Sequence, residues 1–260
     1  MRIARFTTGD DPKFGLVQTE GDRTYLAVLG GDPLYMPAMP TGERVELGDG
    51  VRLLAPVIPR SKIVAVGKNY AAHAAEMGGE VPASPLLFFK PNTAVIGPDD
   101  PIVLPDFSDE ISYEAELAVV IGKVCKEVSE QDAASYVLGY TVANDVTARD
   151  AQRTDGQWAR AKGFDGSCPL GPWIDTDLDP EDVGVSSRVN GEPKQDGRTR
   201  DLVFDVPFLV SYISQAMTLL PGDVILTGTP AGVGLVDHGD RVECEVEGLG
   251  VLANPVLRRA

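Results

Sequence analysis

Histidine, cysteine and positive charge are all scarce in this sequence of 260 residues. Two histidines and three cysteines offer few nitrogen or thiolate ligands, which makes a zinc site less favoured. Cys125, Cys168 and Cys244 lie far apart, are odd in number and have no Cys-X-X-Cys spacing, so we expect no disulfide framework. This usage is typical of a reducing compartment, and we expect a cytoplasmic protein.

The shortage of lysine and arginine excludes several classes of partner. The 39 acidic residues outnumber the 23 basic ones, and the formal net charge is −16. No basic run offers a surface for nucleic acid or anionic lipid, so neither is expected as a partner. No apolar run approaches about 18 residues, and residues 1–6 lack the apolar core of a signal peptide, so no membrane span is expected.

Glycine and proline are plentiful, with 28 and 20 residues, which suits turns and short strands. Strand-like segments at 2–6, 14–18, 24–28 and 51–54 predict a small N-terminal β domain over residues 1–57, followed by a catalytic domain over 58–260. In this second part we predict a mainly β structure with some α: strands at 62–66, 86–89, 94–96, 112–122, 137–146, 223–226 and 241–246, helices at 71–77, 129–136, 147–153 and 208–219, and a hairpin turn at 190–191.

Two acidic residues interrupt the apolar strand predicted at 112–122. Glu114 and Glu116 would share one face, about 6.6–7 Å apart along the strand. Buried carboxylates this close resist ionisation unless a cation lies between them, and Asp145 at the end of the next strand could join them. Carboxylate-only ligation suits Mg²⁺, Mn²⁺ or Ca²⁺. The alternative is a solvated strand face, with Asp145 capping a helix.

Other residues with chemical potential lie on the predicted helices. His73 and Glu76 are i and i+3, so the carboxylate could orient the imidazole as a general base, or the two could form a surface ion pair. Arg149 and Gln152 would share one helix side with Asp145, and Arg149 could bind a substrate carboxylate or pair with a neighbouring Asp.

Lys162 and the glycine-rich loop 227–234 leave two interpretations each. Lys162 lies among aromatic residues and is either a surface charge or a buried cation facing an anionic intermediate. The loop lacks the Lys-Ser/Thr of a phosphate loop, yet its N–H groups and Thr229 could approach a carboxylate. The alternative for the loop is a plain tight turn.

Taken together, these segments resemble the fumarylacetoacetate hydrolase family in its short bacterial form. The matching pieces span roughly residues 62 to 256 in the order of the family, whereas residues 1–57 resemble its small N-terminal unit weakly. One departure is Ser112, where the family often has Asp, which weakens the expected support behind the metal ligands. The motifs that carry the resemblance lie at 67–73, 89–91, 113–117, 144–150, 162–165 and 219–230.

The resemblance implies a mixed β-sandwich roll, usually a homodimer, with Mg²⁺ or Mn²⁺ on two glutamates and an aspartate. It implies that His73 and Glu76 activate water on a lid, and that Lys162 is a cation of the site. By the same resemblance, Thr229 anchors a carboxylate. The residues that it assigns to the metal are Glu114, Glu116 and Asp145, and those that match substrate contacts in some members are Arg149 and Gln152.

The substrates that the resemblance implies are 2-oxo acids. Hydrolysis of a carbon–carbon bond in an acylpyruvate, through a metal-stabilised enolate, is the first hypothesis, with a place in aromatic or amino-acid catabolism. An oxaloacetate decarboxylase or a 2-hydroxyhepta-2,4-diene-1,7-dioate isomerase would use the same enolate. The alternative of another class is a non-catalytic metal-bound protein that binds an anion. Residues 78–84 are expected to touch the far end of the substrate.

Overall fold

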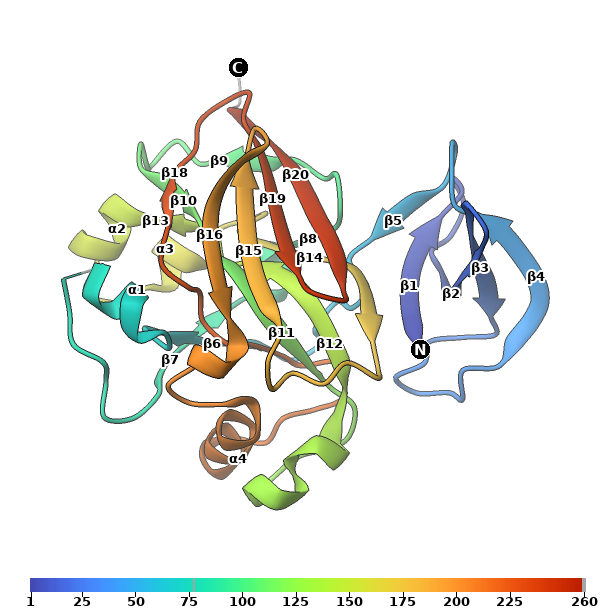
Figure 1. Ribbon diagram of the computed structural model, residues 1–260, viewed down its shortest axis with the longest axis horizontal. Coiled ribbons are helices and arrows are strands. Elements are labelled where there is room, and N and C mark those ends of the chain that lie inside the picture. The colour runs from blue at the N-terminus through green and yellow to red at the C-terminus, as the bar shows by residue number, and fades with distance from the viewer. Residues whose placement is uncertain (77, 259–260) are drawn as a thin grey trace.

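The computed structural model describes residues 1–76 and 78–258. Figure 1 shows a large body of strands with a few short helices on its outside, and a small group of N-terminal strands beside it. The prediction of a mainly β protein with some α is therefore confirmed. None of the helices in this described part is both long and apolar enough to cross a membrane.

The N-terminal group is an antiparallel meander whose first strand joins the main sheet. β1 pairs with β14 of the large body as well as with β2. β4 was not predicted, because its side chains are almost all exposed and show no apolar alternation. A division of the chain at residue 57 stays a prediction. The strands of this group are β1 (Arg2–Thr7), β2 (Lys13–Glu20), β3 (Arg23–Leu29), β4 (Pro40–Glu46) and β5 (Arg52–Leu54).

Two further sheets and the main sheet enclose the core. The main sheet runs in the order β4-β3-β2-β1-β14-β12-β11-β17-β6-β7, a second in the order β16-β15-β19-β20-β9, and a small third one in the order β13-β10-β18. Their strands are β6 (Ile63–Gly67), β7 (Leu86–Lys90), β8 (Val95–Ile96), β9 (Ile102–Leu104), β10 (Ile111–Tyr113), β11 (Ala115–Ile121), β12 (Val137–Asn144), β13 (Thr147–Ala148), β14 (Cys168–Asp175), β15 (Gly184–Val189), β16 (Glu192–Arg198), β17 (Val224–Leu226), β18 (Gly234–Leu235), β19 (Arg241–Val246) and β20 (Gly250–Arg258).

β11 is buried on both faces, which explains its continuous apolar sequence. Leu117 and Val119 belong to the cluster between the main and second sheets. Ala118 and Val120 point the other way, into a cluster with residues of β6, β14 and β17. The strand that carries Glu116 is therefore held rigidly by packing on both sides.

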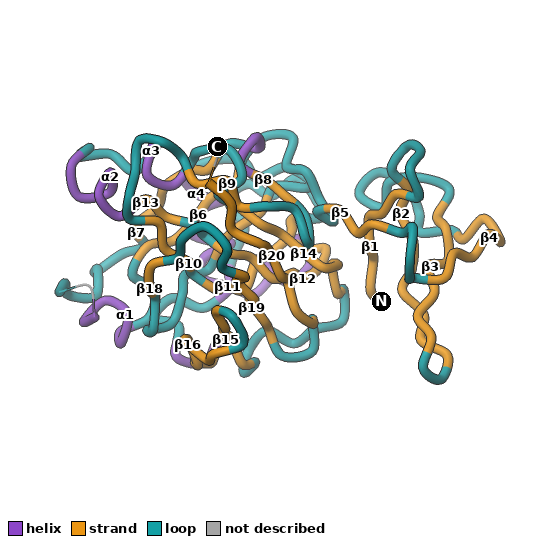
Figure 2. The backbone as a smooth tube through the Cα atoms, turned by 90° about the horizontal axis from the view of Figure 1, so that it is seen from above, coloured by secondary structure: helices purple, strands orange, loops and turns teal. Residues whose placement is uncertain are grey.

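The helices are short, and three of them gather at one end of the body. Figure 2 shows α1, α2 and α3 at the end away from the N-terminal strands. Asp205 caps α4 by accepting from the Phe208 N–H, so this helix begins two residues earlier than predicted. Ser129 caps the segment over Glu130–Tyr136 as predicted, but this segment is a 3₁₀ helix. The elements are α1 (Ala71–Glu76), η1 (Asn92–Ala94), η2 (Glu130–Tyr136), α2 (Arg149–Thr154), α3 (Ala159–Lys162), η3 (Thr199–Asp201) and α4 (Val206–Ala216).

Two predicted elements are divided in the structure, and both divisions shape the site. The strand predicted at 112–122 is interrupted at Glu114, so that β10 and β11 belong to different sheets. The helix predicted at 147–153 begins only at Arg149, because Thr147 and Ala148 pair with β10. The Asn190-Gly191 turn is confirmed: both residues have positive φ, 54° and 80°, and join β15 to β16.

Candidate active site

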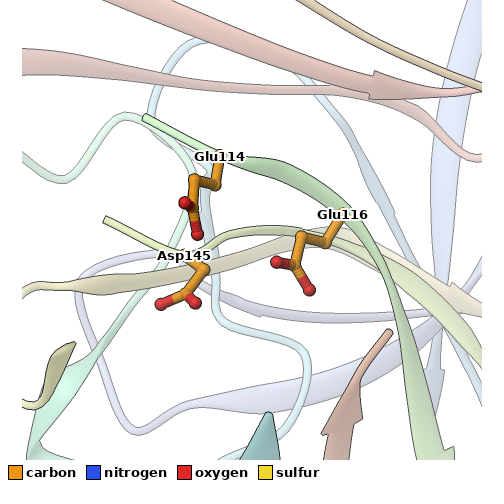
Figure 3. A group of neighbouring side chains, drawn as sticks. All are labelled: Glu114, Glu116 and Asp145. Atoms are coloured by element: carbon orange, nitrogen blue, oxygen red, sulfur yellow. The ribbon is translucent and has the colours of Figure 1, made fainter. Parts of the chain in front are cut away.

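Three carboxylates converge where β10, β11 and β12 meet. Because Ala115 of β11 lies opposite Asn144 of β12, the residues next to them, Glu114 and Asp145, are brought together. Their backbones also join, since the Asp145 N–H donates to the Glu114 carbonyl at 2.9 Å. One oxygen from each of Glu114, Glu116 and Asp145 lies within 4.8 Å of the others, and Figure 3 shows the three side chains reaching into a common space.

The three carboxylates are buried, so the alternative of a solvated strand face is wrong. Glu114 is 4% exposed, Glu116 2% and Asp145 1%. Asp145 also does not cap a helix, because β13 separates it from α2. Burial of this kind requires compensating positive charge.

Two lysines and an arginine supply positive charge to Glu114 and Asp145. Lys162 Nζ lies 2.6 Å from Glu114 Oε2 and 2.7 Å from Asp145 Oδ2. Lys90 Nζ lies 2.5 Å from Asp145 Oδ1, and Arg149 Nη2 lies 2.6 Å from Glu114 Oε1. Although burial lowers the pKa of Lys162, Asp145 and Glu114 hold it above its usual value. Lys162 is therefore a buried cation and not a surface charge.

Glu116 differs from the other two acids in its partners. Its Oε2 accepts from the Gly228 N–H at 2.7 Å, and among the described residues no lysine, arginine or histidine pairs with it. Burial, then repulsion from Asp145 and Glu114, raise the pKa of Glu116 well above its usual value. Burial opposes ionisation of Glu114 too, but Lys162, Arg149 and His73 outweigh it and lower the pKa of Glu114.

These features fit a hard divalent cation. Three oxygen donors face one another, and within residues 1–76 and 78–258 Glu116 has no paired cation, a charge that a bound metal ion would supply. Two polar atoms near the acids are also buried without a partner in the described chain, Asn144 Nδ2 and Tyr70 Oη. Asn144 Oδ1 accepts from the Glu114 N–H, which places this amide beside the triad. Burial, and then the charges of Glu116 and Asp201, raise the pKa of Tyr70.

His73 and Glu76 lie together on α1, as their spacing predicted. His73 Nδ1 is 3.2 Å from Glu76 Oε2, while His73 Nε2 faces Glu114 at 3.9 Å. His73 is only 5% exposed, so the alternative of a surface ion pair is wrong for the imidazole. Glu76 also accepts from the Gly232 N–H at 3.0 Å, which ties α1 to the glycine-rich loop.

Arg149 and Gln152 share one side of α2, and Arg149 Nη1 donates to Gln152 Oε1 at 3.0 Å. The prediction that Asp145 lies on the same helix is wrong, since α2 begins only at Arg149. The ion pair of Arg149 is with Glu114 and not with an aspartate. Its Nη2 also donates to Ser112 Oγ at 3.1 Å, so the serine at the departure from the family pattern supports this arginine.

The glycine-rich loop approaches a carboxylate through the Gly228 N–H, and this carboxylate belongs to Glu116 of the protein itself. The Thr229 hydroxyl donates to the Ala115 carbonyl at 2.8 Å and accepts from Gln195 Nε2 at 2.7 Å. Its proton is therefore directed at the backbone between the two glutamates. A role for Thr229 as a carboxylate anchor stays a prediction.

A cavity of about 200 Å³ brings the predicted residues together. Glu76 does not line it and contacts it through His73. The side of the Lys162 ammonium toward Phe88 is covered by the ring, at 5.1 Å from its centroid. The cavity is lined by Val66, Gly67, Lys68, His73, Phe88, Glu114, Glu116, Asp145, Arg149, Gln152, Trp158, Lys162 and Thr229.

Lys90 and Gln195 support the site from outside the cavity, and the sequence analysis assigned neither of them a role. Lys90 ends the apolar strand β7 and is completely buried, and a lysine closing an apolar run next to Pro91 was the signal for it. Gln195 lies on β16 among exposed residues, yet it is 1% exposed and bonds to Thr229 and to the Ala115 N–H. No local pattern distinguishes it.

Comparison with known proteins identifies two protein families that match this chain. The fumarylacetoacetate (FAA) hydrolase C-terminal family matches residues 62–257, and the Rv2993c-like N-terminal family matches residues 1–56. The structure of 5-carboxymethyl-2-hydroxymuconate delta-isomerase from Mycobacterium smegmatis is 51% identical, covers 100% of both chains and superposes with a TM-score of 0.92. The mitochondrial oxaloacetate tautomerase Fahd2a of Rattus norvegicus is 46% identical over 80% of this chain and 70% of its own.

A third relative bears on the metal. The structure of fumarylpyruvate hydrolase from Pseudomonas aeruginosa, in complex with Mn²⁺ and pyruvate, is 35% identical, with a TM-score of 0.74 over 82% of this chain and 94% of its own. These three relatives are by name an isomerase, a tautomerase and a hydrolase. This chain, with its buried acidic triad, belongs to the fumarylacetoacetate hydrolase family.

Proposed function

We propose that this protein is a Mg²⁺- or Mn²⁺-dependent enzyme of 2-oxo acids that hydrolyses a carbon–carbon bond of an acylpyruvate. The observation that carries the proposal is a buried triad in which Glu116 pairs with no cation of the described residues, beside a histidine whose Nε2 faces the same cavity. Glu114, Glu116 and Asp145 would hold the cation. When bound, the cation supplies Lewis-acid stabilisation of the enolate that carbon–carbon cleavage releases.

His73 is the residue that moves a proton in this proposal. In this proposal the imidazole proton lies on Nδ1 and is donated to Glu76, 3.2 Å away, which leaves Nε2 as the basic nitrogen toward the cavity. Water gives its proton to Nε2 as its oxygen attacks the distal carbonyl carbon. The bond between that carbon and the methylene group then breaks, and the proton on His73 is available for the leaving carbon.

Lys162, Arg149 and Gln152 would handle negative charge. Lys162 presents a buried ammonium to the cavity, and a fixed cation of this kind stabilises charge that develops in the transition state. Arg149 and Gln152 line the cavity as a hydrogen-bonded pair, which suits them to a substrate carboxylate. The expected homodimer stays a prediction.

Proton transfer without hydrolysis is the second candidate. It is favoured by the full-length similarity to an isomerase and by the similarity to an oxaloacetate tautomerase. His73 Nε2 could then move a proton between carbon and oxygen of one substrate, with no attack by water. Oxaloacetate decarboxylation would need neither water nor this histidine.

The test follows three reactions of the Mn²⁺-loaded protein: pyruvate release from acetylpyruvate, enol-to-keto conversion of oxaloacetate, and CO₂ release from oxaloacetate. We expect pyruvate release that a chelator abolishes and His73→Ala removes. The matched control is His238→Ala, since His238 is exposed in a turn. Enol-to-keto conversion without pyruvate would favour the tautomerase. Absence of all three reactions would leave the non-catalytic anion-binding alternative.

A further inference from the structure

Lys68 is a cation of the cavity that the proposed reaction does not use. It follows β6 and lines the same cavity as His73 and Arg149. Within residues 1–76 and 78–258, no carboxylate pairs with its ammonium, whereas Lys162 and Arg149 are both engaged by Glu114. A cation beside a substrate cavity without its own counter-ion is suited to bind an anionic group of the ligand.

The backbone of Lys68 is held in an unfavourable conformation. Its φ is 58°, in the left-handed region that few side chains adopt. The chain is fixed on both sides of it: a Cβ at Gly67 would lie 2.9 Å from the Trp158 ring, and Asn69 Nδ2 donates to the Thr227 and Phe204 carbonyls. Strain that the surroundings impose next to a cavity points to a functional requirement on the side chain.

The ammonium of Lys68 lies beside Gly79, in the segment that follows α1. A Cβ at Gly79 would be only 2.5 Å from Lys68 Nζ, and 3.8 Å from the Ala74 carbonyl of α1. The absence of a side chain at Gly79 therefore leaves room for the ammonium. We expect residues 78–84 to touch the far end of the substrate, and Lys68 Nζ lies beside Gly79, which is one of them.

The charge balance of the site favours an additional anion. The three carboxylates of the triad are matched in number by three buried cations, Lys90, Lys162 and Arg149, which pair with Glu114 and Asp145 and not with Glu116. A bound divalent cation would add two positive charges, and the carboxylate next to the keto group of a 2-oxo acid would neutralise one. Lys68 adds a further positive charge at the cavity. A second carboxylate on the ligand would offset this excess.

We infer that Lys68 is a specificity-determining residue that binds the distal carboxylate of a dicarboxylic 2-oxo acid. The inference rests on the proposed function, because the keto acid must bind at the triad for its far end to reach Lys68. It adds that the protein discriminates between dicarboxylic and methyl-terminated 2-oxo acids through this one ammonium.

The test measures ligand binding, not turnover, by calorimetry on Mn²⁺-loaded protein. The probes are 2-oxo dicarboxylates of four to six carbons and their methyl-terminated counterparts. We expect Lys68→Met to weaken binding of at least one dicarboxylate by roughly 10- to 100-fold, the range of a charge-assisted hydrogen bond, without changing that of its counterpart. Lys68→Arg should restore most of the affinity. Lys123→Met is the matched control, because Lys123 is exposed and also has no ion pair in the described chain.

Three results would overturn the inference. Equal affinity of wild type and Lys68→Met for every dicarboxylate would exclude a contact. An equal loss for both kinds of ligand would mean that Lys68 only supports α1 and the following segment. Wild type that takes up Mn²⁺ but binds none of the 2-oxo acids would refute the proposed function itself, and this inference with it.

Discussion

Replacement of Gln195 by methionine tests whether the triad depends on a polar contact from the second sheet. Gln195 Oε1 accepts from the Ala115 N–H at 3.0 Å and from Ser187 Oγ at 2.9 Å. Its Nε2 donates to Thr229 Oγ1 at 2.7 Å and to the Pro230 carbonyl at 2.8 Å. Methionine has a similar length and fills the space, but it leaves all four groups without this partner.

The expected cost follows from burial. Gln195 is 1% exposed, so water cannot replace its bonds, and the Ala115 N–H and Pro230 carbonyl become buried groups without a partner. Each such group costs about 1–3 kcal/mol, which gives a loss of roughly 2–6 kcal/mol in the free energy of unfolding. For a chain of this size that corresponds to a decrease in Tm of roughly 5–20 °C.

Metal affinity should fall as well, because Ala115 lies between the two glutamates of the triad. When its N–H and the Thr229 hydroxyl lose Gln195, the backbone that aims Glu114 and Glu116 is less well fixed. Residues that orient metal ligands typically contribute about 10- to 100-fold in affinity, and we expect a weakening of Mn²⁺ binding in the lower part of this range.

Urea unfolding and Mn²⁺ titration calorimetry measure the two effects of Gln195→Met. Ser187→Ala is the matched control, because it removes one partner of Gln195 and leaves the bonds to Ala115, Thr229 and Pro230 in place. It should cost about 1 kcal/mol and leave Mn²⁺ affinity unchanged. A Gln195→Met protein with wild-type stability and wild-type Mn²⁺ affinity would refute the reasoning.

Three further predictions concern the triad. Because the pKa of Glu116 is raised, its carboxyl group carries a proton at pH values between its usual pKa and the raised one. Mn²⁺ must displace that proton, so the apparent Mn²⁺ affinity should rise with pH across this window. Calorimetry in two buffers of different ionisation enthalpy should detect the proton release. Glu116→Gln should abolish the rise in Tm that Mn²⁺ gives to wild type. The metal-free variant should be at least as stable as wild type, since a neutral amide avoids the buried charge that is unfavourable beside Glu114 and Asp145. An unchanged Mn²⁺ effect on Tm would contradict the ligand role of Glu116. Lys162→Met should lower the free energy of unfolding by about 3–5 kcal/mol, because the buried carboxylates of Glu114 and Asp145 both lose a cation. Urea unfolding measures this loss, and a loss below about 1 kcal/mol would contradict the buried ion pairs.

Local patterns predicted most strands, and the exceptions have physical reasons. The Asn190-Gly191 turn and the alternation of β19 are local signals, and both correspond to observed elements. β14 was missed although it is central to the main sheet, because Pro169, Gly171 and Pro172 interrupt its sequence. It is a strand because packing between β12 and β1 outweighs these residues. A strand that forms through packing against its neighbours, against the preference of its own residues, cannot be predicted from its own sequence alone.

In the candidate site as well, residues with an unusual local sequence were predicted, and residues whose role depends on distant packing were not. Glu114 and Glu116 were found because two acids in an apolar strand are anomalous within a few residues of sequence. Their proximity to Asp145 followed from the pairing of β11 with β12. The role of Gln195 depends on how the second sheet packs on the first, and nothing near it in the chain reports that packing.

The buried cations were harder to predict than the acids because they come from distant elements. Lys90 reaches Asp145 from β7, at the edge of the sheet and three places from β11 in its order. Lys162 arrives from α3 and Arg149 from α2. Burial of Glu114 and Asp145 is compensated only when β7, α2 and α3 pack against the strands that carry these acids, so folding of this end of the body and neutralisation of the two carboxylates are coupled. Glu116, which gains no such cation in the described chain, is consequently where a bound metal ion would contribute most.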